Sequence, residues 1–257
     1  MPDILARIVS VKEAGLRALR ERGPALERLA ADNVDNHRDF AYALRAAPPA
    51  VIAEVKKASP SRGLLSLDFQ PARTARQYEH GGAAAISVLT DEEFFQGSLA
   101  DLEVVRAACH LPVLRKDFTI DPLHIVEAAA HGADSILLIA AILDSVQMRT
   151  LRELAESLGL AALVEVHTAE ELQAAIDSGA RIIGVNNRDL HTFEVRLSLS
   201  LDLADAIPDS ATRVAESGIF TAADVRHLGD AGYHAFLVGE ALMKSADPAA
   251  ALKALRG

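Results

Sequence analysis

The sequence predicts an α/β fold: a single (β/α)8 TIM barrel spanning residues 1–257, with an N-terminal helical extension over residues 1–48. From residue 50 onward, short apolar runs alternate with amphipathic segments eight times, which is the pattern of repeated β–α units. The 257 residues match the roughly 250 that such a barrel needs. Glycines recur between a predicted helix and the next apolar run, at Gly82, Gly132, Gly179 and Gly232, where a left-handed turn ends a helix.

The N-terminal extension has the periodicity of amphipathic helices. Ile4, Ile8 and Val11 lie at helical spacing, and Arg and Glu fill the intervening positions. A second short helix is predicted over residues 40–45. Pro48 and Pro49 end it, because proline removes a backbone donor and restricts the residue before it.

The barrel elements follow in order. Strands are predicted over residues 51–56, 84–89, 112–116, 135–139, 161–165, 182–186, 213–216 and 235–238. Helices are predicted over residues 71–81, 99–108, 122–131, 144–157, 168–178, 198–206, 221–231 and 247–255. Continuous apolar runs such as residues 136–139 suit a parallel sheet covered on both faces. A doubly wound open sheet would carry a glycine-rich turn after its first strand, whereas residues 57–60 read KASP, so the barrel is favoured.

Composition excludes several classes of partner. The net charge of −10 argues against nucleic acid, although a small phosphorylated ligand remains compatible with it. The longest apolar run covers residues 136–143, far short of the about 20 that cross a membrane, so no membrane association is expected. Cys109 is the only cysteine, which excludes an internal disulfide and a cysteine-based metal site. The N-terminus lacks the apolar segment of a signal peptide, and we expect a cytoplasmic protein.

Polar residues end most of the predicted strands. They are Glu54, Lys56, Lys116, Glu165, Asn186, Arg188 and Glu216. Because the carboxyl ends of all strands in a barrel meet at one face, these side chains are predicted to converge there. Glu54 and Lys56 are two residues apart and share a strand face, so they form either an acid/base pair or a structural salt bridge. The other charges on the same rim favour a catalytic site, since burying charges without a function costs several kcal/mol each unless they are paired.

Three further features surround this predicted site. Gly218 and Gly239 follow the last two strands, where phosphate-binding barrels hold their anion, and Ser217 adds a hydroxyl. Phe95, Phe118, Leu137, Leu190 and Leu237 are candidates for an apolar wall against a flat ring, although plain packing is the commoner role of such residues. The nine histidines show no ligand spacing, so no metal is expected.

An ordered set of motifs resembles one family. The motifs are IAEVKKASPS at 52–61, SVLT at 87–90, FFQG at 94–97, LRKDF at 114–118, VEV at 164–166, GVNNRDL at 184–190, VAESGI at 214–219 and FLVG at 236–239. Together they resemble the indole-3-glycerol-phosphate synthases of tryptophan biosynthesis. This resemblance implies ring closure of 1-(2-carboxyphenylamino)-1-deoxyribulose 5-phosphate to an indole, with loss of carbon dioxide and water and without cofactor or metal.

The resemblance also implies roles for individual residues. Lys116 would be the acid that protonates the ribulose carbonyl. Glu165 and Lys56 would complete dehydration, with Glu54 orienting Lys56, and which of the two supplies the acid stays open. Substrate contacts would come from Ser59, Phe95, Phe118, Leu137, Asn186, Arg188, Leu190, Glu216 and Leu237. Phosphate contacts would come from Lys56, Ser217, Gly218, Gly239 and Glu240. Where some members carry Ser, this chain has Glu240, so we expect its carboxylate to point away from the phosphate and only its backbone N–H to contribute.

Several alternatives remain at this point. A phosphoribosyl-anthranilate isomerase needs a Cys at a strand end, whereas Cys109 lies on the helix before the third predicted strand. A Schiff-base aldolase remains possible with Lys116 as the nucleophile. A degenerate phosphate-binding barrel with a non-catalytic role is the non-enzymatic alternative. We expect a monomer, since no isolated apolar stripe demands a partner.

Overall fold

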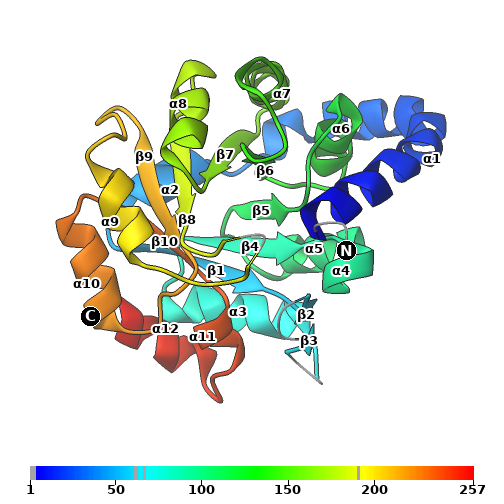
Figure 1. Ribbon diagram of the computed structural model, residues 1–257. Helices are drawn as coiled ribbons and strands as arrows, with labels where there is room; N and C mark the ends of the chain where they lie inside the picture. The colour runs from blue at the N-terminus through cyan, green and yellow to red at the C-terminus, as the bar shows by residue number, and fades with distance from the viewer. Residues whose placement is uncertain (1–3, 61–62, 66–67, 190–191) are drawn as a thin grey trace.

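The computed structural model describes residues 4–60, 63–65, 68–189 and 192–257. Within these residues, eight parallel strands close into a barrel in the order β1-β10-β9-β8-β7-β6-β5-β4 (Figure 1). The strands are β1 (Ala50–Val55), β4 (Ala85–Leu89), β5 (Val113–Lys116), β6 (Ser135–Ile139), β7 (Ala161–Val166), β8 (Ile182–Asn186), β9 (Thr212–Glu216) and β10 (Ala235–Val238). The predicted (β/α)8 barrel is confirmed, including the pairing of the first strand with the last, Ile52 opposite Leu237.

A helix follows each barrel strand and covers the outside of the sheet. These helices are α3 (Pro71–Gly81), α5 (Leu99–Ala108), α6 (Pro122–Ala130), α7 (Ser145–Ser157), α8 (Ala169–Asp177), α9 (Ser198–Ala204), α10 (Ala222–Asp230) and α12 (Pro248–Arg256). The predicted helices begin up to one residue early because Asp144, Thr168, Thr221 and Asp247 are N-caps whose side chains accept a backbone N–H of the first turn.

Short elements at the carboxyl face escaped prediction. They are α4 (Glu92–Phe95) and the hairpin β2 (Ala58–Ser59) with β3 (Gly63–Leu64). Elements of two to four residues are too short to show a periodicity in the sequence. A further short helix, α11 (Glu240–Met243), begins directly after Gly239, where the sequence indicates a helix start near Ala241. The predicted glycine turns are confirmed, since Gly82, Gly132, Gly179 and Gly232 all have φ between 79° and 91°.

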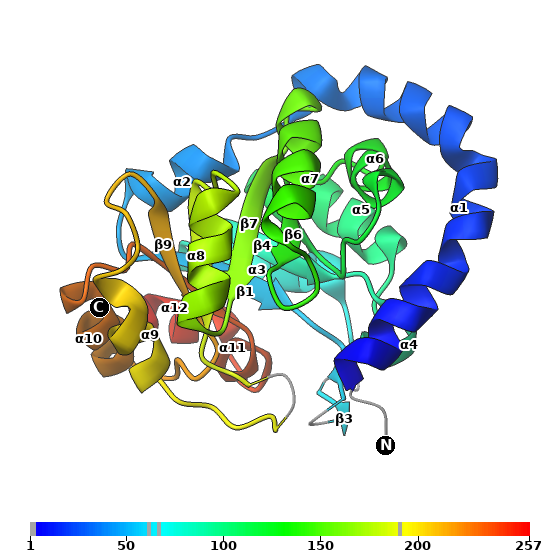
Figure 2. The same cartoon turned by 45° about the horizontal axis from the view of Figure 1, so that its top comes forward.

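The N-terminal extension holds α1 (Ile4–Asn33), a 3-10 turn η1 (Val34–Asn36) and α2 (Phe40–Ala46). Figure 2 shows α1 curving around the outside of the barrel, from α4 past α6 toward α7. The side chain of Asn33 donates to the carbonyls of Ala129 and Ala130, which lie at the end of α6 and lack partners within that helix. The carboxyl end of α1 is therefore held to the barrel at the end of α6.

Helix α2 closes the amino-terminal end of the barrel. Phe40 and Leu44, one turn apart, are 1% and 0% exposed and pack with Ile52, Leu114 and Leu163 inside the barrel. A separate, larger core fills the space between the strands and the surrounding helices. Since the amino-terminal end is filled with apolar side chains, the carboxyl end is the one that can admit a ligand.

Gly97, just after α4, lies against the backbone of β4. A Cβ there would overlap the carbonyl oxygen of Leu89 and lie 2.6 Å from its carbon, and neither can rotate away. We expect Gly97→Ala to lower the free energy of unfolding by about 2 kcal/mol, in the range typical of overpacking. In Gly229→Ala, where nothing lies within 4 Å of the new Cβ on α10, we expect a gain of about 0.5–1 kcal/mol because Ala favours the helix.

Urea unfolding followed by circular dichroism measures both variants. Equal midpoints for Gly97→Ala and the unsubstituted protein would mean that the Leu89 carbonyl moves freely, contrary to this interpretation.

Candidate active site

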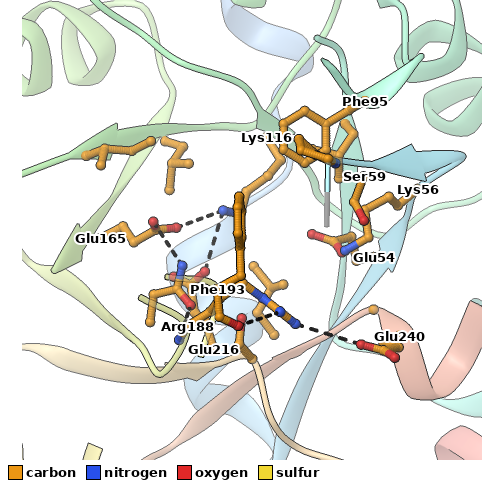
Figure 3. A pocket seen from close by; sticks show the side chains of 18 of the residues that line it. Glu54, Lys56, Ser59, Phe95, Lys116, Glu165, Arg188, Phe193, Glu216 and Glu240 are labelled. Atoms are coloured by element: carbon orange, nitrogen blue, oxygen red, sulfur yellow. Dashed lines mark hydrogen bonds and ion pairs between the residues drawn. The ribbon is translucent and has the colours of Figure 1, made fainter. Parts of the chain in front are cut away.

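The polar strand ends meet around one cavity at the carboxyl face of the barrel (Figure 3). All the site residues predicted from the sequence and described by the structure line it. They are Glu54, Lys56, Ser59, Phe95, Lys116, Phe118, Leu137, Glu165, Asn186, Arg188, Glu216, Ser217, Gly218, Leu237, Gly239 and Glu240. Leu190, also predicted, lies outside the described residues. The linear pattern of polar residues after apolar runs therefore corresponds to one three-dimensional site.

Lys116 at the end of β5 is the centre of the charged cluster. Its Nζ donates to Oε2 of Glu165 at 2.8 Å and lies 3.6 Å from Oε2 of Glu216. The other carboxylate oxygen of Glu165 accepts from the side-chain amide of Asn186 at 3.1 Å. Figure 3 shows the amine directed toward both carboxylates, so strands β5, β7, β8 and β9 each supply one group to this cluster.

The surroundings give Lys116, Glu165 and Glu216 three different charges. Burial opposes the charge on Lys116, but Glu165, Glu216 and Glu54 more than offset it and raise the pKa of the ammonium. Burial would also raise the pKa of Glu165, yet the Lys116 and His167 charges lower it to about 2. For Glu216, burial and the neighbouring Glu165 carboxylate raise the pKa to about 8 against the opposing charge of Lys116. At neutral pH the cluster thus holds an ammonium, a carboxylate and a carboxylic acid.

Glu54 and Lys56 form the second charged pair. The Lys56 ammonium donates to Oε2 of Glu54, so the predicted contact within this pair is confirmed. The Glu54 carboxylate also lies against Gly239 at the end of β10, at a place where any Cβ would overlap it. Gly184 makes room for Glu216 in the same way. Two glycines therefore admit carboxylates into the barrel mouth, a requirement that the sequence pattern did not indicate.

Apolar side chains form another part of the cavity lining. The rings of Phe95 and Phe118 lie 6.2 Å apart between centroids and are tilted by 38°. Leu137 and Leu237 are buried and also line the cavity. Helix α1 adds Ile4, Leu5 and Ile8 to the lining, and Phe193 adds a further ring. Such a surface fits a planar aromatic group, because flat rings pack favourably against tilted or offset aromatic side chains.

The loops after β9 and β10 line the cavity with Ser217, Gly218, Gly239 and Glu240. Ser217 and Gly218 have φ of 63° and 77°, and this left-handed pair turns the chain toward α10. Glu240 is among the residues that line the cavity, with Oε1 accepting from Lys244 Nζ at 2.7 Å and Oε2 lying 3.7 Å from Arg188 Nη2. Figure 3 shows the contact with Arg188, and Lys244 holds the other carboxylate oxygen. The expectation that the Glu240 carboxylate points away from a bound phosphate stays a prediction.

His167 belongs to the site although it was not among the residues predicted from the sequence. Its Nε2 lies 3.5 Å from Oε1 of Glu165, and its Nδ1 lies 3.2 Å from Oε2 of Glu171 on α8. Burial lowers the pKa of this imidazole, but Glu171 and Glu165 together raise it above its ordinary value. His167 follows Glu165 by two residues, the same spacing that linked Glu54 to Lys56, so the signal was present in the sequence.

Two other features bear on the alternatives. Cys109 is buried at the end of α5, next to the carbonyl of Val105, and does not line the cavity. This placement removes the thiol that a phosphoribosyl-anthranilate isomerase would need. In the part of the chain that the structure describes, no group of three or more His, Cys, Asp or Glu could hold a metal ion. No helix among the same residues is long and apolar enough to cross a membrane.

Comparisons with solved structures support the barrel architecture. A thiamine phosphate pyrophosphorylase from Pyrococcus furiosus superposes with a TM-score of 0.60 at 18% identity, over 80% of this chain and 93% of that one. An N-acetylmannosamine-6-phosphate 2-epimerase from Clostridium perfringens gives a TM-score of 0.60 at 16% identity, over 80% and 90%. At such low identity these likenesses concern the fold alone.

Sequence relatives are more specific. The family profile described as indole-3-glycerol phosphate synthase matches residues 5–255. An indole-3-glycerol phosphate synthase of Chromobacterium violaceum is 51% identical over 260 residues, covering 99% of this chain and 98% of the relative. With nearly the whole length matched on both sides, the chain belongs to the indole-3-glycerol phosphate synthase family.

Proposed function

We propose that the Lys116 cluster carries out the ring closure catalysed by indole-3-glycerol phosphate synthase, a carboxy-lyase of tryptophan biosynthesis. The substrate is 1-(2-carboxyphenylamino)-1-deoxy-D-ribulose 5-phosphate, and the products are indole-3-glycerol phosphate, carbon dioxide and water. The observation that carries the assignment is a buried ammonium, held protonated by carboxylates, beside an apolar wall suited to an aromatic ring. This arrangement provides an acid next to the place where the ring would lie.

Lys116 is the acid of the first step. As the ring carbon bearing the carboxylate attacks the ribulose C2 carbonyl, Lys116 donates a proton to the carbonyl oxygen, which becomes a hydroxyl. The ring carboxylate then leaves as carbon dioxide. The Glu165 carboxylate lowers the energy of the ammonium before the reaction and keeps Lys116 charged when substrate binds.

The dehydration step falls to Glu165 and Lys56. Because its pKa is lowered, the Glu165 carboxylate is a proton acceptor at neutral pH. We therefore assign it the role of the base that restores aromaticity. Lys56, paired with Glu54, is then the acid that protonates the departing hydroxyl. This choice between the two residues follows from charge state, which the sequence left open.

Substrate contacts follow from the cavity lining. Phe95, Phe118, Leu137 and Leu237 border the place of the aromatic ring, and Leu190 stays a candidate from the sequence alone. We assign Arg188 to the carboxylate of the substrate, and Asn186, Glu216 and Ser59 to its hydroxyls, because all four line the cavity. The backbone at Ser217, Gly218, Gly239 and Glu240, together with Lys56, would receive the phosphate.

A Schiff base on Lys116 is disfavoured by its charge. An amine must be neutral to attack a carbonyl, whereas the carboxylates around Lys116 raise its pKa. We therefore expect borohydride to trap no adduct between the enzyme and the substrate. Mass spectrometry of the treated protein checks this, and a mass increase that disappears in Lys116→Arg would reverse the assignment.

The direct test is indole formation by the purified protein. The sequence contains no Trp, so the fluorescence of the product rises from a low background. We expect the signal to appear with the substrate and to persist in EDTA, as the metal-free reaction requires. A folded protein without signal would favour the non-catalytic barrel instead. Size-exclusion chromatography and fractionation would test the predicted monomer and its predicted cytoplasmic location.

A further inference from the structure

Lys12 of α1 reaches into the barrel mouth and contacts two buried carboxylates. Its Nζ lies 2.6 Å from Oδ1 of Asp117 and 3.0 Å from Oδ2 of Asp91. The two aspartate side chains are 6% and 2% exposed, and that of Lys12 is 16% exposed. Burial lowers the pKa of Lys12, but the two aspartates more than compensate and raise it, so the lysine is charged. A desolvated ion triple of this kind is far more rigid than an exposed ion pair.

Each aspartate holds a segment that carries one ring of the apolar wall. Asp91 is the N-cap of α4, its side chain accepting the backbone N–H of Phe94 at 2.7 Å, and α4 ends at Phe95. Asp117 accepts the backbone N–H of Phe118 at 2.8 Å and directly follows Lys116. One ammonium therefore connects helix α1 to both ring-bearing segments.

The same helix face lines the cavity. Ile4, Ile8 and Lys12 are spaced four residues apart, so they lie above one another on α1. Ile4 and Ile8 border the cavity, and Lys12 follows one turn further along. The guanidinium of Arg7 lies 5.6 Å from the centre of the Phe94 ring, a second contact between α1 and α4. Lys12 thus fixes the position of an apolar strip that covers the site.

We propose that Lys12 is a positioning residue of the synthase, pinning α1, Phe95 and Phe118 together so that they form the wall against which the substrate's aromatic ring lies. Lys12 does not line the cavity itself, so it acts through Asp91 and Asp117. The inference rests on the proposed function. It predicts a defect confined to the aromatic part of the substrate, because the phosphate end is received by the loops after β9 and β10.

The test compares Lys12→Met, Lys12→Arg and Arg20→Met. Arg20 is the matched control, since it also links α1 to the barrel, at 3.7 Å from Asp121, but its side chain is 65% exposed and touches neither ring-bearing segment. Each variant is assayed for kcat and KM with the carboxyphenylamino-deoxyribulose phosphate, and for competitive inhibition by inorganic phosphate. Circular dichroism establishes that each is folded under the assay conditions. If Lys12→Met does not fold, Lys12→Gln takes its place.

We expect Lys12→Met to lower kcat/KM by about 10- to 100-fold, as small misplacements of binding groups do, with the inhibition constant of phosphate unchanged. Lys12→Arg should recover part of the loss because it keeps the charge, and Arg20→Met should match the unsubstituted enzyme. Unchanged kinetics in Lys12→Met, or a parallel loss of phosphate inhibition, would overturn the inference while leaving the function intact. An inactive unsubstituted protein would overturn the proposed function, and this inference with it.

Discussion

Replacing Lys116 by Met is expected to lower kcat by about three orders of magnitude, within the range that general acid catalysis supplies. The variant loses the proton donor for the ribulose carbonyl. It also leaves Glu165 without the ammonium that holds it charged at 2.8 Å. A buried carboxylate without its cation takes up a proton, so the base of the later step is impaired as well. The effect on kcat should therefore be among the largest that a single substitution in the cavity produces.

The variant Lys116→Arg distinguishes the electrostatic role of Lys116 from its role as a proton donor. A guanidinium keeps the positive charge beside Glu165 and Glu216, but it does not release a proton within the working pH range. We expect this variant to be nearly as inactive as Lys116→Met while unfolding at a urea concentration closer to that of the unsubstituted enzyme. Steady-state indole fluorescence gives kcat for both variants. Substantial activity in Lys116→Arg would assign the residue an electrostatic role and remove it as the acid.

The barrel and most of its site could be predicted because the relevant signals are local. An apolar run followed by Lys116, Glu165 or Glu216 marks a strand end, and closure of the barrel brings all strand ends to one face. The two-residue spacing that paired Glu54 with Lys56 also holds because alternate strand residues share a face. Both patterns involve residues that are close together in the sequence, so they can be recognised without knowing which distant residues are in contact.

What escaped prediction depends on distant contacts. Lys12 shares a helix face with Ile4 and Ile8, but the periodicity of α1 does not reveal that Asp91 and Asp117, far away in the sequence, are its partners. The contact between Arg188 and Glu240 joins the ends of two different strands, β8 and β10. The raised pKa of Glu216 results from burial together with the charges of Lys116, Glu165 and Glu54. Such a pKa shift can be predicted only when the positions of all the neighbouring charged groups are known.

Replacing Glu165 by Gln is the second substitution with a large expected effect. The amide cannot accept the proton that dehydration releases, so kcat at neutral pH should fall by about 10²- to 10⁴-fold. The product fluorescence assay measures this loss. Gln keeps the size of the side chain and can still hydrogen-bond to Asn186, so the site should retain its shape. An activity within the range of the unsubstituted enzyme would show that another group, with Lys56 the nearest candidate, is the base.

The same variant is expected to change how the free energy of unfolding depends on pH, in a direction that the pKa of Glu165 determines. Glu165 has a pKa of about 2 in the folded state against an ordinary value of 4.5, so it contributes stability that is fully present above about pH 4.5 and is lost as the pH falls toward 2. The difference in unfolding free energy between the enzyme and Glu165→Gln should shrink over that window, as urea titrations at successive pH values would measure.

Glu216→Gln is the matched control, because its carboxyl is shifted in the opposite direction. With a pKa raised to about 8, Glu216 binds a proton more tightly in the folded state, so its contribution to stability falls as the pH rises from about 4.5 to 8. Glu216→Gln, which does not titrate, should therefore gain stability relative to the unsubstituted enzyme across that window. The two windows do not overlap, so each carboxyl is measured separately. If both differences changed in the same window and with the same sign, the two glutamates would share one charge state, and the assignment of Glu165 as the base and Glu216 as a neutral acid would fail.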